Sequence, residues 1–232
     1  VIHELESVSR QWNISLCGGH TEITDAVTRP VIIGMLAGTV AKRDLVDKRN
    51  IQPGDSVLLT KAVAVEGTAI IAREFGDRLA TLGMSKAEIE TCRQFLSSIG
   101  ILEEAKIAGN FQGVSAMHDI TEGGLATALL ELSVAGRHRI RVAMDRIPVF
   151  PETQKICRLC HIDPMGLIGS GSLLICCRES TAEPLMEGIR DAGIQIARIG
   201  EVMDPGRGID AVGPAGPVPW PSFEADEITR LF

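Results

Sequence analysis

Short apolar runs alternate with stretches of helical periodicity along most of this chain, and this alternation constrains the fold more than any other feature. The runs SVLLT (56–60) and SLLICC (172–177) have the length of buried strands. EGTAIIAREFG (66–76) has the pattern of a helix, and Ser85 with Glu88 has the capping-box spacing that starts another. Strands and helices mixed at this density pack in layers. We therefore predict an α+β fold, a layered α/β sandwich with a mixed sheet.

The same alternation continues to about residue 203. Further strands are expected at ISLC (14–17), VIIGMLAGTVA (31–41), VSAM (114–117), RIRVAM (139–144) and residues 194–203. Further helices are expected at residues 2–12, 101–110, 124–136, 151–162 and 181–192. Residues 205–221 are rich in Gly and Pro and predict an irregular tail, and EADEITRLF (224–232) predicts a last helical turn. With six Phe, two Trp and no Tyr, the core must consist of Val, Ile, Leu, Ala and Met.

Charge and hydropathy exclude two classes of partner. The chain carries 23 basic and 30 acidic residues, a net charge of −7, and no run of Lys or Arg, which argues against nucleic acid. The uncharged stretches at 30–41 and 164–177 are too short and too rich in glycine to span a bilayer. No signal peptide is visible, so we expect a cytoplasmic protein without a membrane partner.

The segment MHDITEGGL (117–125) places polar residues where an apolar run turns into a helix. Free N–H groups and the dipole at a helix start favour anions, and Gly123 and Gly124 would let a ligand approach the backbone. Asp119 beside such a turn could hold Mg²⁺, which takes oxygen ligands. The alternative is that Asp119 or Thr121 only caps the helix. The local pattern by itself favours capping.

A second loop, CGGHTEIT (17–24), also sets paired glycines and polar groups after an expected strand. Gly18, Gly19, His20 and Thr21 could form an ordinary turn. Two such loops in one chain favour a shared polyanion site. Neither loop is a Walker loop or a dinucleotide fingerprint, and no serine lies in a nucleophile-elbow sequence, so the catalytic residues stay unknown.

Two further patterns have ordinary structural explanations. CRLCH (157–161) matches the c-type haem attachment sequence, but Ile156, Leu159 and Cys160 share one apolar helical face, which favours buried thiols. A zinc site would need a second ligand pair, and the adjacent Cys176 and Cys177 would point to opposite faces of a strand. We therefore predict neither haem nor zinc, and no structural disulfide. Lys61 could reach a phosphate, although a solvated strand-end lysine is the simpler interpretation.

Five motifs together resemble one enzyme superfamily. The chain is similar to proteins related to aminoimidazole ribonucleotide (AIR) synthase, a superfamily that includes hydrogenase expression/formation proteins, selenophosphate synthetase and thiamine-phosphate kinase. The branch that it resembles most is the hydrogenase-maturation-like one. The motifs are GGHTEIT (18–24), PGDSVLLTKAVAVEGTAIIARE (53–74), MHDITEGGLATALLEL (117–132), IDPMGLIGSGSLLI (162–175) and RIGEV (198–202).

The resemblance implies an ATP-dependent enzyme. Members of the superfamily are homodimers that bind Mg-ATP and activate a substrate oxygen by phosphoryl transfer. By this similarity Gly18, Gly19, His20 and Thr21 contribute to nucleotide binding, as do Thr121, Gly123 and Gly124, and Asp119 helps to hold Mg²⁺. Phosphoryl transfer requires positioning and charge neutralisation more than a protein nucleophile. The substrate, whether a small molecule or a group on a protein, does not follow from the motifs.

The departures from the family pattern are equally specific. Nothing resembles the aspartate-rich segment with which relatives bind most of their Mg²⁺. The chain begins at Val1 with a helical pattern, so we expect residues 1–46 to be the remnant of an N-terminal ATP-binding and dimerisation domain and residues 47–232 the C-terminal domain. The chain ends in ITRLF without the terminal cysteine of the hydrogenase-maturation proteins. The missing aspartate-rich segment favours an alternative function, a non-catalytic binding or assembly module that keeps the fold without the metal site.

Overall fold

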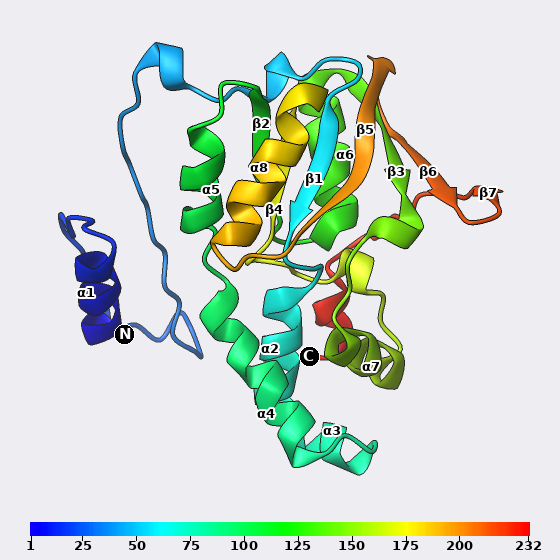
Figure 1. The fold of residues 1–232 in the computed structure, drawn as a ribbon. Coiled ribbons are helices and arrows are strands. Elements are labelled where there is room, and N and C mark those ends of the chain that lie inside the picture. Colours follow the sequence, from blue (N-terminus) through cyan, green and yellow to red (C-terminus); the bar gives the residue numbers. More distant parts are fainter. The chain divides into compact units, whose positions relative to one another are not determined.

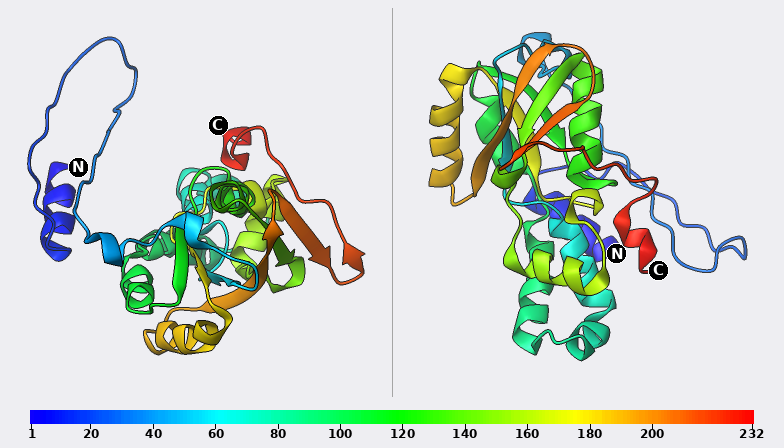
Figure 2. Two further views of the ribbon diagram at one scale, coloured as in Figure 1. Left: turned by 90° about the horizontal axis from the view of Figure 1, so that it is seen from above. Right: turned by 90° about the vertical axis from the view of Figure 1, so that its right-hand side faces the viewer.

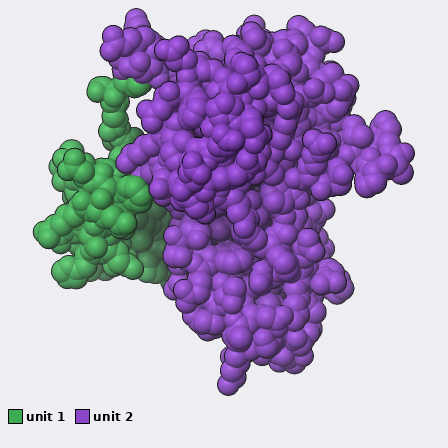
Figure 3. Space-filling view, in the orientation of Figure 1, with its two compact units in different colours: residues 1–40 green, residues 41–232 purple.

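A computed structural model describes all 232 residues, and these divide into two compact units, residues 1–40 and 41–232 (Figure 3). The boundary expected at residues 46 and 47 stays a prediction.

The first unit contains one helix, α1 (Ile2–Gln11), followed by extended chain. Its backbone hydrogen bonds are those of α1 and its C-terminal cap, where Trp12 N–H donates to Val8 O. The strands expected at 14–17 and 31–41 are therefore wrong for this structure. A strand exists through ladder bonds to a neighbour, and no partner strand pairs with either run. Ile33 and Met35 in the second run are 92% and 94% exposed.

The second unit is built on a seven-stranded mixed sheet, which confirms the predicted fold class (Figure 1). The strand order is β2-β4-β1-β5-β3-β6-β7, and every neighbouring pair is antiparallel except β3 with β6. The strands are β1 (Ser56–Thr60), β2 (Val114–Asp119), β3 (His138–Ala143), β4 (Leu173–Cys177), β5 (Ile196–Pro205), β6 (Ile209–Gly213) and β7 (Gly216–Pro217).

Helices cover both faces of this sheet, with α5 and α8 on one face and α6 on the other (Figure 2). Figure 1 shows α2, α4 and α7 gathered beyond the end of β1, with α3 below them. The expected capping box is confirmed, since Ser85 Oγ accepts from Glu88 N–H and the Glu88 carboxylate accepts from Ser85 N–H. The helices are α2 (Val65–Glu74), α3 (Gly76–Thr81), α4 (Lys86–Gln94), α5 (Leu102–Gly109), α6 (Gly124–Gly136), α7 (Pro151–Cys160) and α8 (Glu179–Asp191).

Alternate residues of the central strands supply the two cores. Leu58 of β1 and Cys177 of β4 belong to the core beneath α5 and α8. Leu59 and Cys176 belong to the core beneath α6. This alternation follows from the period of two along a strand. It confirms that the adjacent cysteines occupy core positions on opposite faces.

The segment expected to be an irregular tail is partly strand, which corrects that prediction. β5 extends to Pro205, and β6 pairs in parallel with β3, so the segment finds a partner at the sheet edge. The glycines mark the turns between these strands, since Gly208 and Gly216 have φ of +109° and +121°. The expected last helical turn is present as a 3₁₀ turn, Glu227–Arg230.

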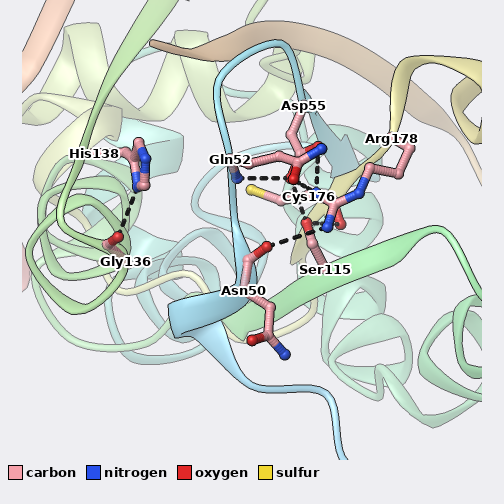
Figure 4. A network of polar contacts seen from close by, with 8 residues as sticks. All are labelled: Asn50, Gln52, Asp55, Ser115, Gly136, His138, Cys176 and Arg178. Atoms are coloured by element: carbon pink, nitrogen blue, oxygen red, sulfur yellow. Dashed lines mark hydrogen bonds and ion pairs between the residues drawn. The ribbon is translucent and has the colours of Figure 1, made fainter. Parts of the chain in front are cut away.

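A buried polar network ties the start of the sheet together (Figure 4). Asp55 is 1% exposed, and its carboxylate accepts from Arg178 Nη1 at 2.6 Å, Ser115 Oγ at 2.7 Å and Gln52 N–H at 3.1 Å. Arg178 also donates to Asn50 O. A buried carboxylate is tolerated because its oxygens are paired and hydrogen-bonded in this way. The network joins the segment before β1 to β2 and β4. It lies at the edge of the sheet opposite to the turn Asp119–Gly124, which is predicted to bind a ligand and is here called the ligand turn.

Candidate functional site

The predicted turn lies at the edge of the sheet where β1 and β2 end and β4 begins. β1 and β2 are both antiparallel to β4, so their carboxyl ends meet at this edge. The loop 163–172, just before β4, contacts both the segment that follows β1 and the segment that follows β2. Gly169 N–H donates to Thr121 O at 3.3 Å, and Ser172 Oγ donates to Ala62 O at 2.5 Å. Segments far apart in the sequence are therefore fixed beside the start of α6.

Both glycines of the turn adopt the left-handed conformation, with φ of +76° at Gly123 and +62° at Gly124. A Cβ on Gly124 would lie 2.5 Å from Met165 O and 2.7 Å from Leu167 O. The three atoms nearest to a Cβ on Gly123 would all belong to the side chain of Thr127. Close packing against the backbone of loop 163–172 is thus sufficient reason for glycine at position 124.

The structure contradicts the capping alternative for the polar residues of the turn. The N-cap of α6 is Gly123, which has no side chain to form a cap hydrogen bond, so neither Asp119 nor Thr121 is the capping residue. The Gly123 N–H donates instead to Asp226 Oδ2 at 2.7 Å. Asp226 was not identified from the sequence, since its contact with Gly123 spans 103 residues and no local pattern encodes it.

Asp119 lies beside this turn with a free carboxylate oxygen. Its side chain is 58% exposed, and Oδ1 is 3.4 Å from His118 Nδ1, while Oδ2 makes no hydrogen bond within the chain. His118 is 10% exposed and is held from its other side by Glu131, with Nε2 3.1 Å from Oε2. His118 therefore orients Asp119 without closing off its outer oxygen. The pairing of His118 with Glu131 on α6 was not predicted from the sequence, because the two residues are 13 positions apart.

Asp119 fits the role of a single Mg²⁺ ligand. Mg²⁺ in phosphate sites is commonly held by one or two carboxylates, the remaining ligands being waters and phosphate oxygens. One exposed carboxylate oxygen is available here. No group of three or more His, Cys, Asp or Glu side chains in the chain is arranged to hold a metal ion.

The Gly-Gly-His loop belongs to the first unit. A Cβ on Gly18 or Gly19 would meet no atom within 4 Å, and Thr21 is exposed. His20 Nε2 lies 3.1 Å from Glu22 Oε2, and both side chains are exposed. The prediction that this loop and the Asp119 turn share one anion site concerns both units and stays a prediction.

Lys61 is not a solvated strand-end lysine, which corrects that interpretation. Its side chain is 16% exposed, and Nζ donates to Glu104 Oε1 at 2.5 Å and to the carbonyls of Gly100 and Gly171, each at 2.8 Å. These bonds use all three donors of the ammonium group. Glu104, which is 1% exposed, also accepts from Thr60 Oγ1. The pair fastens α5 to the end of β1 and leaves no donor of Lys61 for a phosphate.

The cysteines of CRLCH lie on α7 as expected. Cys157 is 3% exposed, and burial raises the pKa of its thiol to about 12. Burial also raises the pKa of the Cys160 thiol. All six cysteines are free thiols. The predictions of no haem and no zinc stay predictions.

A surface hollow of about 480 Å³ lies elsewhere, between α2 and α4. Its lining contains none of the residues predicted for the ligand site, and its donors are already engaged in part, since Arg93 Nε donates to Ala72 O and Nη1 lies 3.5 Å from Glu90. We place the candidate site at the turn rather than at this hollow, because the turn brings together the polar groups that phosphate chemistry needs.

None of the helices combines the length and apolar character required to cross a membrane.

Comparison with known proteins identifies relatives of this fold. Residues 52–212 match the family described as AIR synthase related protein, C-terminal domain. The carbamoyl dehydratase HypE of Cupriavidus necator is 26% identical over 215 residues, which are 89% of this chain and 57% of that protein. The crystal structure of HypE from Escherichia coli superposes with a TM-score of 0.62 and 22% identity, covering 78% of this chain and 54% of that one.

A second solved structure, a hydrogenase maturation protein HypE in complex with ATP, has a TM-score of 0.58 and 20% identity, over 78% of this chain and 54% of that one. The chain therefore spans just over half the length of the relatives that it matches.

Proposed function

The chain belongs to the family of AIR synthase related proteins, C-terminal domain, and from this premise we propose that it is part of an ATP-dependent enzyme that binds Mg-ATP and activates a substrate oxygen by phosphoryl transfer. The observation that carries the proposal is the Asp119–Gly124 turn. It combines an exposed carboxylate with the start of a 13-residue helix that has no side-chain cap of its own.

The start of α6 suits a phosphate group. The first N–H groups of a helix lack intrahelical acceptors, and the dipole places partial positive charge there. Because position 123 carries no side chain, the Asp226 carboxylate reaches its N–H group, so an oxygen anion can approach the backbone at this point. Thr121, Gly123 and Gly124 would line a bound phosphate.

The charges around the turn explain why the ligand would be Mg-ATP rather than free ATP. Asp119 and Glu122 are exposed carboxylates just before the start of α6, and Glu131 is an exposed carboxylate further along α6, beside His118. Free ATP would meet their negative charge. Mg²⁺ held at Asp119 would supply the charge neutralisation that phosphoryl transfer needs. The His118 ring lies between the two carboxylates, with Nδ1 facing Asp119 and Nε2 facing Glu131, and so limits where Asp119 can move.

Calorimetric titration of the chain with ATP tests this proposal. Saturable binding should occur with Mg²⁺, disappear when Mg²⁺ is chelated, and weaken strongly in Asp119→Asn. Asp204→Asn is the matched control, because Asp204 is exposed, makes no side-chain hydrogen bond and lies near the end of β5, at the opposite edge of the sheet. Equal affinity of the wild type and Asp119→Asn would refute the assignment of the site.

A second candidate function is a non-catalytic binding or assembly module. The observation that favours it is the exposed apolar surface of the first unit, where Ile23, Ile33 and Met35 are 95%, 92% and 94% exposed. Exposed apolar surface of this kind is typical of protein interaction sites. Turnover separates the candidates, because an enzyme converts ATP in the presence of its acceptor and a module does not.

The oligomeric state and substrate belong to the same proposal. We expect the complete protein to be a homodimer, as the resemblance implies, and light scattering of the purified protein tests this. The acceptor is a small molecule or a group on another protein.

A further inference from the structure

The C-terminal segment Trp220–Phe232, here called the strap, packs along the edge that carries the ligand turn. At its start, Trp220 Nε1 donates to Ala126 O of α6 at 3.2 Å. At its end, the Phe232 ring packs edge-on against Phe75, with centroids 5.1 Å apart. Between them Phe223 covers Gly166, where a Cβ would lie 2.5 Å from the ring. The strap is thus attached to both sides of the turn.

The strap places a carboxylate at the position where an anion would bind. Asp226 Oδ2 accepts from Gly123 N–H at 2.7 Å, and Oδ1 accepts from Ile228 N–H at 2.9 Å within the strap itself. A phosphate oxygen at the start of α6 would seek the same N–H group and the same end of the helix dipole. Asp226 and a phosphate group therefore compete for one donor.

The contacts of the strap differ in character along its length. Glu227 is 7% exposed and accepts from Asp163 N–H, and Ile228 and Leu231 pack against the core formed by α2, α4 and α7. Asp226 is only partly buried, and its tie to the turn is the single bond to Gly123. The bond at the turn can therefore open while the apolar residues beyond it stay packed.

We propose that the strap is an autoinhibitory contact, in which the Asp226 carboxylate occupies the phosphate position at the start of α6 and must leave before a phosphate ligand binds. The inference rests on the proposed function, since it concerns access to the same turn. It adds a means of control, because any partner or modification that holds the strap away from Gly123 would raise the affinity of the turn for its ligand.

Substitution of Asp226 in the full chain tests the competition. Asp226→Asn keeps the size of the side chain and removes its charge, and Asp226→Ala also removes the acceptor. Both should bind Mg-ATP more tightly than wild type, by about tenfold for the alanine variant, which corresponds to about 1.4 kcal/mol. Glu224→Gln is the control, because Glu224 lies on the same strap, is exposed and makes no side-chain hydrogen bond.

A second readout follows the strap itself. Trp12 and Trp220 are the only two tryptophans, so Trp12→Phe leaves Trp220 as the sole indole reporter. Addition of Mg-ATP should change Trp220 emission and increase amide hydrogen exchange at the N–H group of Ile228, which loses Asp226 Oδ1 as its acceptor, whereas the Gly123 N–H exchanges its acceptor for a phosphate oxygen and stays protected.

The outcomes separate the two proposals. Wild-type binding with unchanged affinity in both Asp226 variants, and with unchanged exchange at the N–H group of Ile228, would overturn the autoinhibitory contact and leave the proposed function intact. An equal gain in Glu224→Gln and Asp226→Asn would also overturn it, because the effect would then be one of net charge. Absence of binding in the wild type and in every Asp226 variant would overturn both.

Discussion

Replacing Gly124 by alanine tests how tightly the ligand turn is packed against loop 163–172. Alanine at a φ of +62° costs about 1–2 kcal/mol, because the left-handed conformation brings Cβ close to the backbone. Its Cβ would also lie 2.5 Å from Met165 O and 2.7 Å from Leu167 O. These are backbone atoms that cannot rotate away, and overpacking of this kind costs about 1–3 kcal/mol. The free energy of unfolding should therefore fall by roughly 2–5 kcal/mol.

Gly193→Ala is the matched control for the conformational part of this cost. Gly193 has a φ of +77°, and a Cβ there would meet no atom within 4 Å. The free energy of unfolding of Gly193→Ala should fall by only about 1–2 kcal/mol. Urea unfolding followed by circular dichroism measures both variants. In thermal melts, the extra loss in Gly124→Ala corresponds to a melting temperature lower by roughly 2–12 °C than that of the control. Equal losses in the two variants would refute the close backbone approach.

Three further predictions concern residues away from the turn. Lys61→Met should destabilise the chain by about 3–5 kcal/mol in urea unfolding, because it leaves the Glu104 carboxylate buried and unpaired. The double variant Lys61→Met/Glu104→Leu should recover most of this loss of stability, and no recovery would contradict the pairing. Hydrogen bonds from Lys155 and Ser85 lower the pKa of Glu88 to about 2. Its contribution to stability is then complete above the ordinary value near 4.5 and is lost as the pH falls toward 2, so Glu88→Gln should show a smaller decrease in unfolding midpoint between pH 6 and pH 3 than wild type. Burial raises the pKa of Cys92 and of Cys157 to about 12, whereas Cys17 is exposed. A thiol reagent at pH 8 should therefore modify Cys17 first in the folded chain, and rapid modification of Cys157 would contradict its burial.

The elements that could be predicted from sequence are those with a local signal. The strand at 56–60, the Ser85 capping box and the opposite faces of Cys176 and Cys177 each depend on residues within a few positions of one another. The run 31–41 has an apolar pattern like that of a strand, but a strand also needs a neighbour, and the pattern does not contain that information. The tail strand β6 was missed for the converse reason, since its partner β3 lies far back in the chain.

In the candidate site, too, only the features with a local sequence signal could be predicted. The pattern MHDITEGGL was sufficient to identify a turn at a helix start, with Asp119 beside it. No local pattern predicts that Gly123 N–H donates to Asp226, because these residues are 103 positions apart. Nor does one predict that Lys61 forms an ion pair with Glu104, 43 positions away. The sequence does not show which polar side chains are already paired, because the fold brings their partners together from distant positions.

The central claim is that nucleotide phosphate binds at the Asp119–Gly124 turn, and amide chemical shifts in a titration of the isotope-labelled chain with Mg-ATP test it most directly. Binding at the turn should produce saturable shifts at the N–H groups of Asp119, Gly123, Gly124 and Leu125, together with a change at Ile228 as Asp226 leaves its place. Shifts confined to residues elsewhere, such as those lining the hollow between α2 and α4, would contradict it.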